Sequence, residues 1–468
     1  MKNEGVLIIL LFLLSFTFLR ALSLPITGAS GPIRVPQDFS TIQQAIDASA
    51  SGATILIEAG TYNENITVWK PLVIKGESAD STIIEQAGAF AVCHVTANNV
   101  NISGFTLKDG SIGLWIDSCN YNSVTSIIVT NNEDGMWVTS SHGSIISSNI
   151  LTDNLFMGLY LEASDSTSID SNTVARNTYG IYAQNSEYNT IHGNNISLNY
   201  ADGIDAINNN YSAVYYNLIS NNSLGIYLEG SNGNSIYENN LVDNIDQVWA
   251  ESTTTNSWDD GSHGNYWSNY AGVDTNGDGI GDTPHVINGN NQDRYPLMNP
   301  WINIAVADVL PSKSNVGEGY RLYISVTVQN QGWNAQTTNL TVYVNTTVVG
   351  TVASLALPER SQAILNFTWQ TTPALKGNYV LSSTVDPIPN EPDVRDNNKT
   401  YGRIVKVTVV GDVNGDGAVD IFDAITLSNA FASVPNSPTW NGNVDINSDN
   451  SVDIFDAILL SGNFGKKI

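Results

Sequence analysis

The sequence predicts a mainly β protein that begins with a parallel β-helix, continues with a β-sandwich and ends in a small α-helical module. A short repeat with regularly spaced glycines predicts the first part. Alternating apolar stretches predict the second part, and two matched acidic loops that each lead into an apolar helix predict the third. The 468 residues exceed the length of one ordinary domain, in agreement with several.

Glycine marks the repeat. The glycines recur at a nearly constant interval, and Gln247 takes their place in the last turn: Gly113, Gly135, Gly158, Gly180, Gly203 and Gly225. The segments between them are short and β-branched and have no helical period, so each repeat is a coil of short strands. Stacked coils place like residues above like, about 4.8 Å apart, which is a parallel β-helix.

Two further features support this fold. An asparagine column, which we expect to form a ladder of amides at a bend, consists of Asn149, Asn172, Asn195, Asn217 and Asn240. Ahead of the repeats, the segment 38–47 has an N-cap and a helical apolar spacing. We expect it to form a helix that shields the open end of the stack.

Strand alternation places the second residue after each glycine on the outer surface. We call the rings of this column the aromatic stripe: Trp115, Trp137, Tyr160, Tyr182, Tyr227 and Trp249. Asp205 interrupts it, and Glu162 and Glu229 lie two residues further along their strands. Aromatic faces beside carboxylates suit sugars, because C–H faces stack and hydroxyls find acceptors. A ring ladder that only stabilises the fold is the alternative.

The catalytic candidates are Asp205, Glu229 and Glu162. We expect Asp205 and Glu229 one coil apart and diagonal, within about 7–8 Å. That separation falls between those of retaining and inverting glycosidases. A lyase would need an Arg or Lys base, and the repeats offer only Arg176, with two histidines near turns. An enzyme is therefore the second hypothesis.

The composition excludes several classes of protein. Charged residues are 13% of the chain, and 18 Lys+Arg against 45 Asp+Glu give a net charge of −27. Such a surface repels phosphate backbones, so nucleic acid and anionic membranes are not expected partners. A hydrophobic content of 42% with 10 Trp and 20 Tyr excludes a disordered acidic chain.

The segment 1–23 is typical of a secretory signal, with Lys2 ahead of the apolar run 6–19. Fourteen residues rise only about 21 Å as a helix, less than the ~30 Å core of a bilayer, so we prefer a cleaved signal to an anchor. We expect no membrane span after cleavage. Two cysteines, out of line on neighbouring coils, exclude a disulfide scaffold.

The ends of the repeat region resemble known families. The run Ser40-Thr-Ile-Gln-Gln-Ala-Ile-Asp47 with Gly60-Thr-Tyr-Asn-Glu-Asn65 resembles the opening of pectin-lyase-like right-handed β-helices. The closing segments 256–261, 264–267 and 293–297 resemble the NosD-like surface proteins common in archaea. The resemblance implies a right-handed β-helix over residues 31–301 but no particular activity. The basic clusters of pectin-lyase-like enzymes are missing, and five scattered histidines give no support to a copper role.

Residues 302–410 lack the glycine repeat and have a different sequence pattern. Alternating stretches at 322–329 and 340–344, separated by turn signals, predict a β-sandwich. The segments 328–332, 367–369 and 377–379 with the pair Asn397-Asn398 resemble a CARDB-type, immunoglobulin-like adhesion domain. A spacer is the alternative role.

Residues 411–468 hold two matched loops, of which the first begins at Asp412 and the second at Asp445. Oxygens at loop positions 1, 3, 5, 9 and 12, with the carbonyl of position 7, suit Ca²⁺. The predicted ligands are Asp412, Asn414, Asp416, Ala418, Asp420 and Asp423, and then Asp445, Asn447, Asp449, Ser451, Asp453 and Asp456.

Tandem half EF-hands with Asp at position 12 resemble a type I dockerin. The resemblance implies attachment to a cohesin-like or surface scaffold protein. Positions 10 and 11 are Ile421-Phe422 and Ile454-Phe455, so the small polar pair often used in cellulosome dockerins is absent. Packing of the module onto itself or its neighbour stays open as an alternative.

A third acidic loop precedes the sandwich. Asp274, Asn276, Asp278 and Asp282 occupy positions 1, 3, 5 and 9, and His285 stands at position 12. We expect Ca²⁺ in this non-EF loop. A turn that merely caps the β-helix is the alternative.

The sequence therefore predicts a secreted, calcium-binding cell-surface protein. Its β-helix presents a face for a polysaccharide or other glycan, and its dockerin-like end binds a protein. The second hypothesis is a lyase or glycoside hydrolase of polysaccharide catabolism, brought to a complex by the same module. The third is a purely structural coat component.

Overall fold

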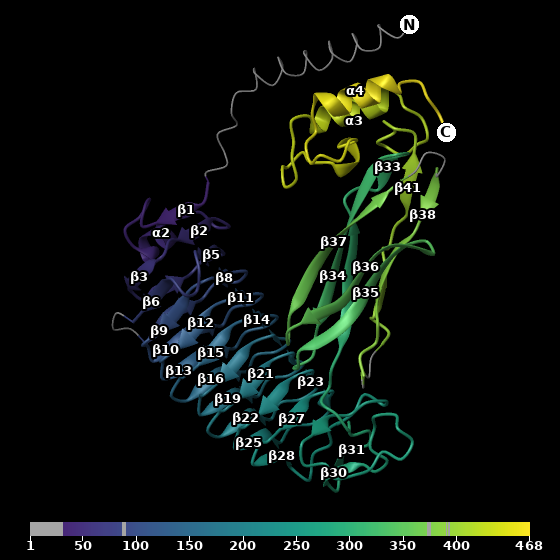
Figure 1. The fold of residues 1–468 in the computed structure, drawn as a ribbon. Coiled ribbons are helices and arrows are strands. Elements are labelled where there is room, and N and C mark those ends of the chain that lie inside the picture. The colour runs from purple at the N-terminus through teal and green to yellow at the C-terminus, as the bar shows by residue number, and fades with distance from the viewer. Residues whose placement is uncertain (1–30, 87–89, 372–375, 390, 392–393) are drawn as a thin grey trace. The chain divides into compact units, whose positions relative to one another are not determined.

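The structure is a computed structural model that describes residues 31–86, 90–371, 376–389, 391 and 394–468 (Figure 1). The signal sequence expected at 1–23 lies outside these residues. The chain separates into two compact units, Ala29–Trp301 and Ile302–Ile468. In the described part of the chain, no helix is long and apolar enough to cross a bilayer.

Three parallel sheets form the first unit, and each strand pairs with the equivalent strand of the next coil. The β1–β26 sheet contains β1 (Ile33–Val35), β2 (Thr54–Ile57), β5 (Val73–Gly76), β8 (Asn101–Ser103), β11 (Ser123–Thr125), β14 (Ile145–Ser147), β17 (Ser168–Asp170), β20 (Thr190–His192), β23 (Ala213–Tyr215) and β26 (Ser235–Tyr237). The β4–β28 sheet contains β4 (Ile66–Val68), β7 (Ala91–Val95), β10 (Ile112–Asp117), β13 (Asp134–Thr139), β16 (Met157–Glu162), β19 (Tyr179–Gln184), β22 (Asp202–Ile207), β25 (Leu224–Glu229) and β28 (Asp246–Ala250). The β3–β29 sheet contains β3 (Gly60–Asn63), β6 (Thr82–Glu85), β9 (Thr106–Lys108), β12 (Ile128–Thr130), β15 (Ile150–Thr152), β18 (Thr173–Ala175), β21 (Asn195–Ser197), β24 (Leu218–Ser220), β27 (Asn240–Val242) and β29 (Tyr266–Trp267). The predicted parallel β-helix is confirmed.

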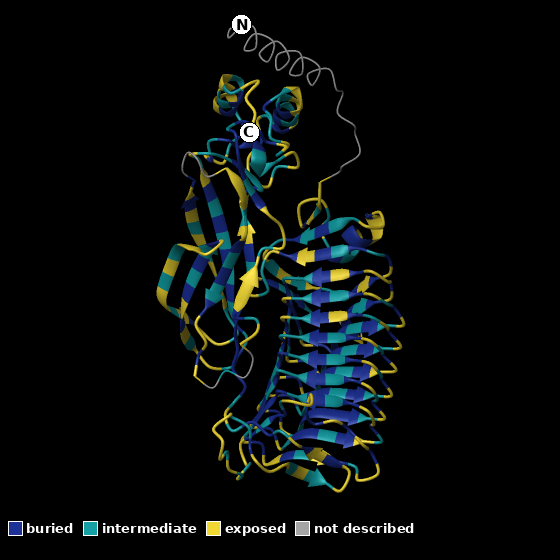
Figure 2. Cartoon of the chain, turned by 90° about the vertical axis from the view of Figure 1, so that its right-hand side faces the viewer, coloured by how far each residue is buried: buried dark blue, intermediate teal, exposed yellow. Residues whose placement is uncertain are grey.

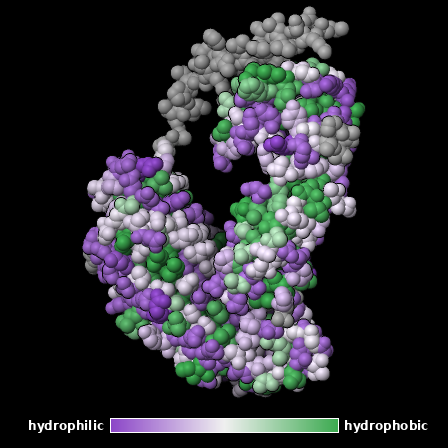
Figure 3. Space-filling model, in the orientation of Figure 1, coloured by the Kyte–Doolittle hydropathy of each residue, from purple (hydrophilic) through white to green (hydrophobic). Residues whose placement is uncertain are grey.

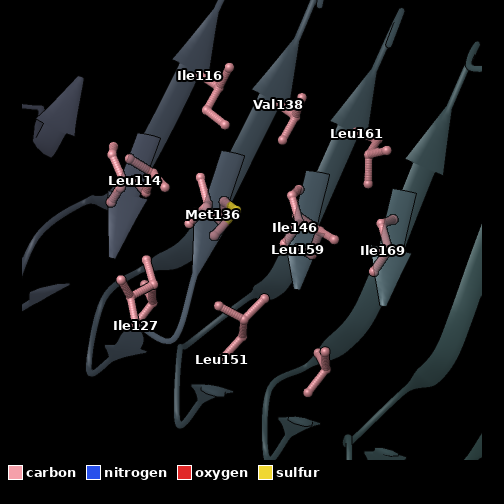
Figure 4. Close-up of a cluster of buried hydrophobic side chains, with 14 of the residues drawn as sticks. Leu114, Ile116, Ile127, Met136, Val138, Ile146, Leu151, Leu159, Leu161 and Ile169 are labelled. Atoms are coloured by element: carbon pink, nitrogen blue, oxygen red, sulfur yellow. The ribbon is translucent and has the colours of Figure 1, made fainter. Parts of the chain in front are cut away.

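The interior is a stack of aliphatic side chains. Leu114 pairs with Met136, which pairs with Leu159 on the next coil, and all three are fully buried (Figure 4). Buried positions recur at the same place on successive strands (Figure 2). Burial of each such side chain contributes roughly 1.5–3 kcal/mol. The column glycines are required by close approach, since a Cβ on Gly180 would lie 2.4 Å from the Gly203 carbonyl oxygen.

Buried asparagines bind successive coils together. The first ladder is Asn149, Asn172, Asn194, Asn217, Asn239 and Asn265, in which each Nδ2 donates to the next Oδ1 at 2.9–3.0 Å. The sequence-based assignment of Asn195 and Asn240 to this column is wrong by one residue, because those side chains begin β21 and β27. A second ladder consists of Asn132, Asn154, Asn177, Asn199, Asn222 and Asn244.

Helix α2 (Ile42–Ala48) covers the N-terminal end of the core with Ile42, Ala45 and Ile46. It is shorter than the predicted helix at 38–47. Thr41 is its N-cap and accepts from the Gln44 amide, whereas Asp38 accepts from the Arg34 amide before the helix starts.

The C-terminal end of the β-helix is closed by residues 251–301, which include the hairpin of β30 (His285–Asn288) and β31 (Asn291–Asp293). Trp258 and Trp267 are fully buried and complete the core. The Asp293 carboxylate accepts from the Asn265 amide at 2.7 Å and from Trp267 Nε1 at 2.8 Å.

The second unit begins with a β-sandwich. Its three small sheets contain β32 (Ile304–Pro311), β34 (Arg321–Asn330) and β37 (Gln362–Gln370); β33 (Asn315–Gly317), β41 (Val405–Thr408) and β38 (Gly377–Tyr379); and β36 (Thr347–Leu357), β35 (Gln336–Val344), β39 (Leu381–Val385) and β40 (Asn398–Thr400). The alternating residues of β34 and β35 enter one core, as their sequence period predicts.

The chain ends in a module with helices α3 (Ile421–Ala430) and α4 (Ile454–Gly462) and the 3₁₀ helix η1 (Gly442–Val444). Leu427 and Leu460 belong to its small core. Both helices are placed where the sequence predicts them, directly after the acidic loops.

Candidate functional site

The aromatic stripe forms one column on the outer side of the β4–β28 sheet. Trp115 pairs with Trp137, and Tyr160 pairs with Trp137 and Tyr182. Asp205 follows Tyr182 in register, and Tyr227 and Trp249 complete the column. The structure thus brings all six predicted rings together, with Asp205 in the gap between two tyrosines.

The rings of the stripe meet in two different ways. Trp115 and Trp137 lie edge to face, at 6.2 Å and 83°, and Trp137 and Tyr160 do so at 5.4 Å and 67°. Tyr227 and Trp249 stack in parallel, at 4.6 Å and 11°. An edge-to-face contact leaves ring faces that the next ring does not cover, whereas parallel stacking covers them. Trp249 is 43% exposed, whereas Trp115 and Trp137 are only partly exposed, and Phe90 lies edge-on to both of them.

The three predicted carboxylates are not all together. Glu229 is exposed and accepts a hydrogen bond from the Tyr227 hydroxyl at 2.9 Å. Asp205 faces Tyr227 and Glu229 faces Ile207, so these two carboxylates have the diagonal relation that the sequence predicts. Glu162 pairs with Gln184 and lies on β16, well before β25, so it belongs to the other part of the stripe.

Asp202 was missed by sequence reasoning. It begins β22, shortly before Asp205, and the two carboxyl groups are hydrogen-bonded. Burial, followed by the charge and hydrogen bond of Asp202, raises the pKa of Asp205 to about 7. Asp205 is 5% exposed, and its Oδ1 has no hydrogen-bond partner. A carboxyl pair that shares a proton near neutral pH therefore interrupts the stripe.

This pair predicts a pH dependence of folding. The folded-state pKa of Asp205 is about 7 against an ordinary 3.8, so the folded chain holds a proton that the unfolded chain releases. Stability should be highest below pH 4 for this group and should fall as the pH rises to about 7. The full shift corresponds to on the order of 4 kcal/mol. Urea unfolding from pH 4 to 8 should show this slope in the parent, and Asp205→Asn should make it shallower without abolishing it, because burial also raises the pKa of Asp293, to about 6; equal slopes would contradict the prediction.

Lysine and arginine are absent from the described strands of the β4–β28 sheet. Arg176 lies at a turn and donates to both oxygens of Asp153, at 2.7 and 2.6 Å. His192 is on β20 of another sheet, 3.1 Å from Asp170. The stripe therefore offers acceptors, hydroxyls and ring faces to a ligand, without a Lys or Arg base.

The acidic loops of the C-terminal module have matching hydrogen bonds. Asp412 accepts from the amides of Gly415 and Gly417, and Asp445 accepts from those of Asp449 and Asn450. Asn414 and Asn447 each accept from the amide two residues later. Asp416 and Asp449 do the same toward Ala418 and Ser451.

The last predicted ligands of each loop also lie at the start of the helices. Asp420 is the N-cap of α3 and forms a capping box with Asp423, and Asp453 and Asp456 repeat this on α4. Asp423 Oδ1 accepts from the amides of Val413 and Asn414, which ties position 12 to positions 2 and 3. Gly417 and Asn450 at position 6 have φ of 95° and 67°, as the sharp turn requires.

The third loop shares the first half of this pattern. Asp274 accepts from the amides of Gly277 and Gly279, and Asp278 accepts from that of Ile280. Asp282 at position 9 accepts from the Thr275 amide at 2.9 Å, the position-2 contact that Asp423 makes in the C-terminal loop. Asn276 accepts from the Asp278 amide. The ring of His285, at position 12, stacks on Trp267 at 4.4 Å instead of joining the acidic residues of the loop.

Other groups were missed as well. His94 extends the aromatic stripe by stacking on Trp115 at 4.4 Å. A second column, His192, Tyr215 and Tyr237, stacks in parallel on the β1–β26 sheet at 5.2–5.3 Å. Its members recur at the interval of the repeat, so the sequence alone could have predicted this column. Glu238, Asp260 and His263 hold their ligand atoms within 4.8 Å of one another. Their sequence spacing follows no repeat.

Three family profiles match the chain. The one described as "Periplasmic copper-binding protein (NosD)" matches residues 46–272, CARDB matches residues 304–402, and "Dockerin type I domain" matches residues 410–464. The resemblances to NosD-like proteins, to a CARDB domain and to a type I dockerin are confirmed.

Individual proteins and solved structures are similar to this chain only over part of its length or at low sequence identity. A cell surface glycoprotein of Methanothermus fervidus is 34% identical over 127 residues, which are 25% of this chain and only 20% of that protein. A CARDB domain from Pyrococcus furiosus, solved in complex with di-metal ions, is 24% identical and covers 23% of this chain and 96% of its own, with a TM-score of 0.21. The A-module of a mannuronan C-5 epimerase from Azotobacter vinelandii is 15% identical over 51% of this chain and 92% of its own, with a TM-score of 0.36.

Proposed function

We propose that the protein is an exported, modular cell-surface protein whose β-helix binds a glycan through the aromatic stripe and whose calcium-loaded dockerin-like module attaches it to a protein partner. The profile matches to NosD, CARDB and dockerin support a modular surface or attachment role. The match to a named cell surface glycoprotein supports the location.

The observation that carries the glycan proposal is the single column of aromatic rings on the outer side of the β4–β28 sheet, with carboxylates beside it. Glu162 stands beside Tyr160 and supplies an acceptor for sugar hydroxyls, as Asp117 does beside Trp115.

Calcium is the cation that fits the loops. Their donors are carboxylate, amide and carbonyl oxygens, without sulfur or imidazole, which suits a hard cation. Asp412 and Asp445 are 3% and 4% exposed, and buried carboxylates at this density repel one another unless a cation offsets their charge. Asp274, Asn276, Asp278 and Asp282 would hold a third ion by the same chemistry.

The docking surface that we propose is the exposed apolar side of α3 and α4. Its residues repeat across the two helices: Ile421, Phe422 and Ile425, and Ile454, Phe455 and Ile458. Phe422 and Phe455 are 63% and 61% exposed. Figure 3 shows hydrophobic side chains gathered over these helices. Because the surface is apolar and the module matches dockerins, a cohesin-type scaffold protein is the partner it suits.

The glycan proposal is tested by electrophoresis of the mature chain through gels that contain different polysaccharides. We expect at least one polysaccharide to retard the parent, and the combined changes Trp137→Ala, Tyr160→Ala and Tyr182→Ala to weaken retardation at least tenfold, since each stacked ring contributes about 0.5–1.5 kcal/mol. A matched control changes Tyr188 and Tyr211, a stacked exposed pair outside the stripe, to Ala. Equal loss in the control would contradict a role for the stripe.

A polysaccharide lyase or glycoside hydrolase remains the second candidate, favoured by the Asp202–Asp205 pair beside Glu229. Reducing-sugar and unsaturated-uronide assays on a polysaccharide panel test it. Turnover that Asp205→Asn abolishes would establish the enzyme, and unchanged turnover would exclude these carboxylates.

A further inference from the structure

One end of the β-sandwich contacts the backbone of both C-terminal acidic loops. Lys313, which precedes β33 and is 6% exposed, donates from Nζ to the Asp445 carbonyl oxygen. Lys406 on β41 donates from Nζ to the Gly415 carbonyl oxygen. Each loop therefore receives one ammonium group from the sandwich.

The contacts are related by the repeat within the module. Gly415 and Ser448 both occupy position 4 of their loops, and the Tyr323 hydroxyl donates to the Ser448 carbonyl at 3.3 Å. Thus the sandwich donates to the position-4 carbonyl of both loops. Asn315 Nδ2 adds a hydrogen bond to the Val413 carbonyl at 3.1 Å.

The segment between the loops is held as well. Asn443 in η1 accepts through Oδ1 from the amides of Ser314, at 2.8 Å, and Asn315, at 3.0 Å. Its Nδ2 donates to Ser314 Oγ at 3.0 Å. One asparagine thus satisfies two amides of the chain that leads into β33.

Two glycines permit this close approach. A Cβ on Gly442 would lie 2.2 Å from the Ser312 carbonyl oxygen, and one on Gly415 would lie 2.6 Å from Asn315 Oδ1. Ser448 adopts a φ of 63° at the position equivalent to Gly415, so the backbone alone does not demand glycine there. At Gly415, the close contact with the Asn315 side chain adds to the positive φ of 78°.

We infer that this end of the sandwich, formed by Lys313, Asn315, Tyr323 and Lys406, is an interaction surface for the calcium-loaded loops of the same chain, so that calcium binding and docking of the module on the sandwich are coupled. The inference rests on the proposed calcium loading. Eight loop aspartates carry a charge of −8, two Ca²⁺ ions offset four of these charges, and the two lysines offset two more. Without calcium, the loops whose carbonyls the sandwich contacts have no ion to order them.

A functional consequence follows for attachment. The loop side of the module is occupied by its own sandwich, which leaves the apolar side of α3 and α4 for an outside partner. The sandwich then holds the docking helices in a fixed direction instead of acting as a loose spacer.

Hydrogen exchange of the full mature chain, with calcium or with a chelator, tests the inference. We expect calcium to slow exchange at least tenfold in the loops, 412–423 and 445–456, and also in the sandwich segment 312–323. The combined change Lys313→Met and Lys406→Met should abolish the protection of 312–323 and, because coupling is reciprocal, weaken calcium binding about fivefold or more. The control is Lys399→Met on exposed β40.

Gly442→Val provides a second variant outside both loops and should separate the surfaces while the loops still bind calcium. Protection of the loops without any calcium effect on 312–323 would overturn the inference and leave calcium binding standing. No calcium effect on the loops would overturn the proposed loading itself.

Discussion

Chelation of calcium is expected to unfold α3 and α4 while the β-helix coils remain folded. The C-terminal module has a small core, and its loops hold eight aspartates that repel one another without a cation. At calcium a thousandfold above its dissociation constant, each bound ion contributes about 4 kcal/mol. Hydrogen exchange of the full chain should therefore accelerate by several orders of magnitude in 421–430 and 454–462 after chelation, and by little in β10 to β25.

A matched pair of variants sharpens this prediction. Asp423→Asn and Asp456→Asn together remove the position-12 charge from both loops, and their helices should exchange quickly with or without calcium. Asn429→Ala, on an exposed position of α3, is the control and should respond to calcium like the parent. Equal helix protection before and after chelation in the parent would contradict the calcium assignment.

Asn194→Ala is expected to destabilise the β-helix by on the order of 3–5 kcal/mol, because several buried polar groups lose their partners and each costs about 1–3 kcal/mol. Asn194 Oδ1 accepts from both nitrogens of Asn172, at 2.9 and 3.0 Å, and its Nδ2 donates to the Ile169 carbonyl at 2.9 Å. The side chain is fully buried, so water cannot replace these bonds. The free energy of urea unfolding of the first unit measures the loss.

The neighbouring residue is the control. Asn195 begins β21, is only partly buried and lies outside the ladder. Asn195→Ala should cost less than about 1 kcal/mol, as a substitution away from a buried network does. Similar losses for the two variants would mean that the ladder is not the source of the stability.

The same pair of residues shows how far the sequence predicts the fold. Period and alternation were enough for the coils, because a glycine and two inward apolar residues recur on six successive turns. They could not choose between Asn194 and Asn195, or between Asn239 and Asn240, since the interval of the repeat varies slightly and both members of each pair fit it. The ladder hydrogen bonds separate them, because Asn194 and Asn239 donate to the next asparagine of the column, at 3.0 and 2.9 Å.

Some residues of the candidate sites could likewise be predicted from the sequence, and others could not. The aromatic stripe and the acidic loops are local or periodic patterns, so the sequence predicts their members. Asp202 was missed because strict alternation from the inward Ile204 counts Asp202 as inward, whereas its carboxyl group is hydrogen-bonded to that of Asp205. The contact of Lys313 with Asp445 joins residues 132 positions apart, and no local pattern predicts it.

Binding of the mature chain to an array of defined glycans tests the central proposal, that the aromatic stripe is a carbohydrate-binding face. We predict binding to a restricted set of related glycans, retained by the variant with Tyr188→Ala and Tyr211→Ala and lost by the variant with Trp137→Ala, Tyr160→Ala and Tyr182→Ala. Absence of binding by the folded parent to any glycan of the array would contradict the proposal and leave the stripe as a structural ladder.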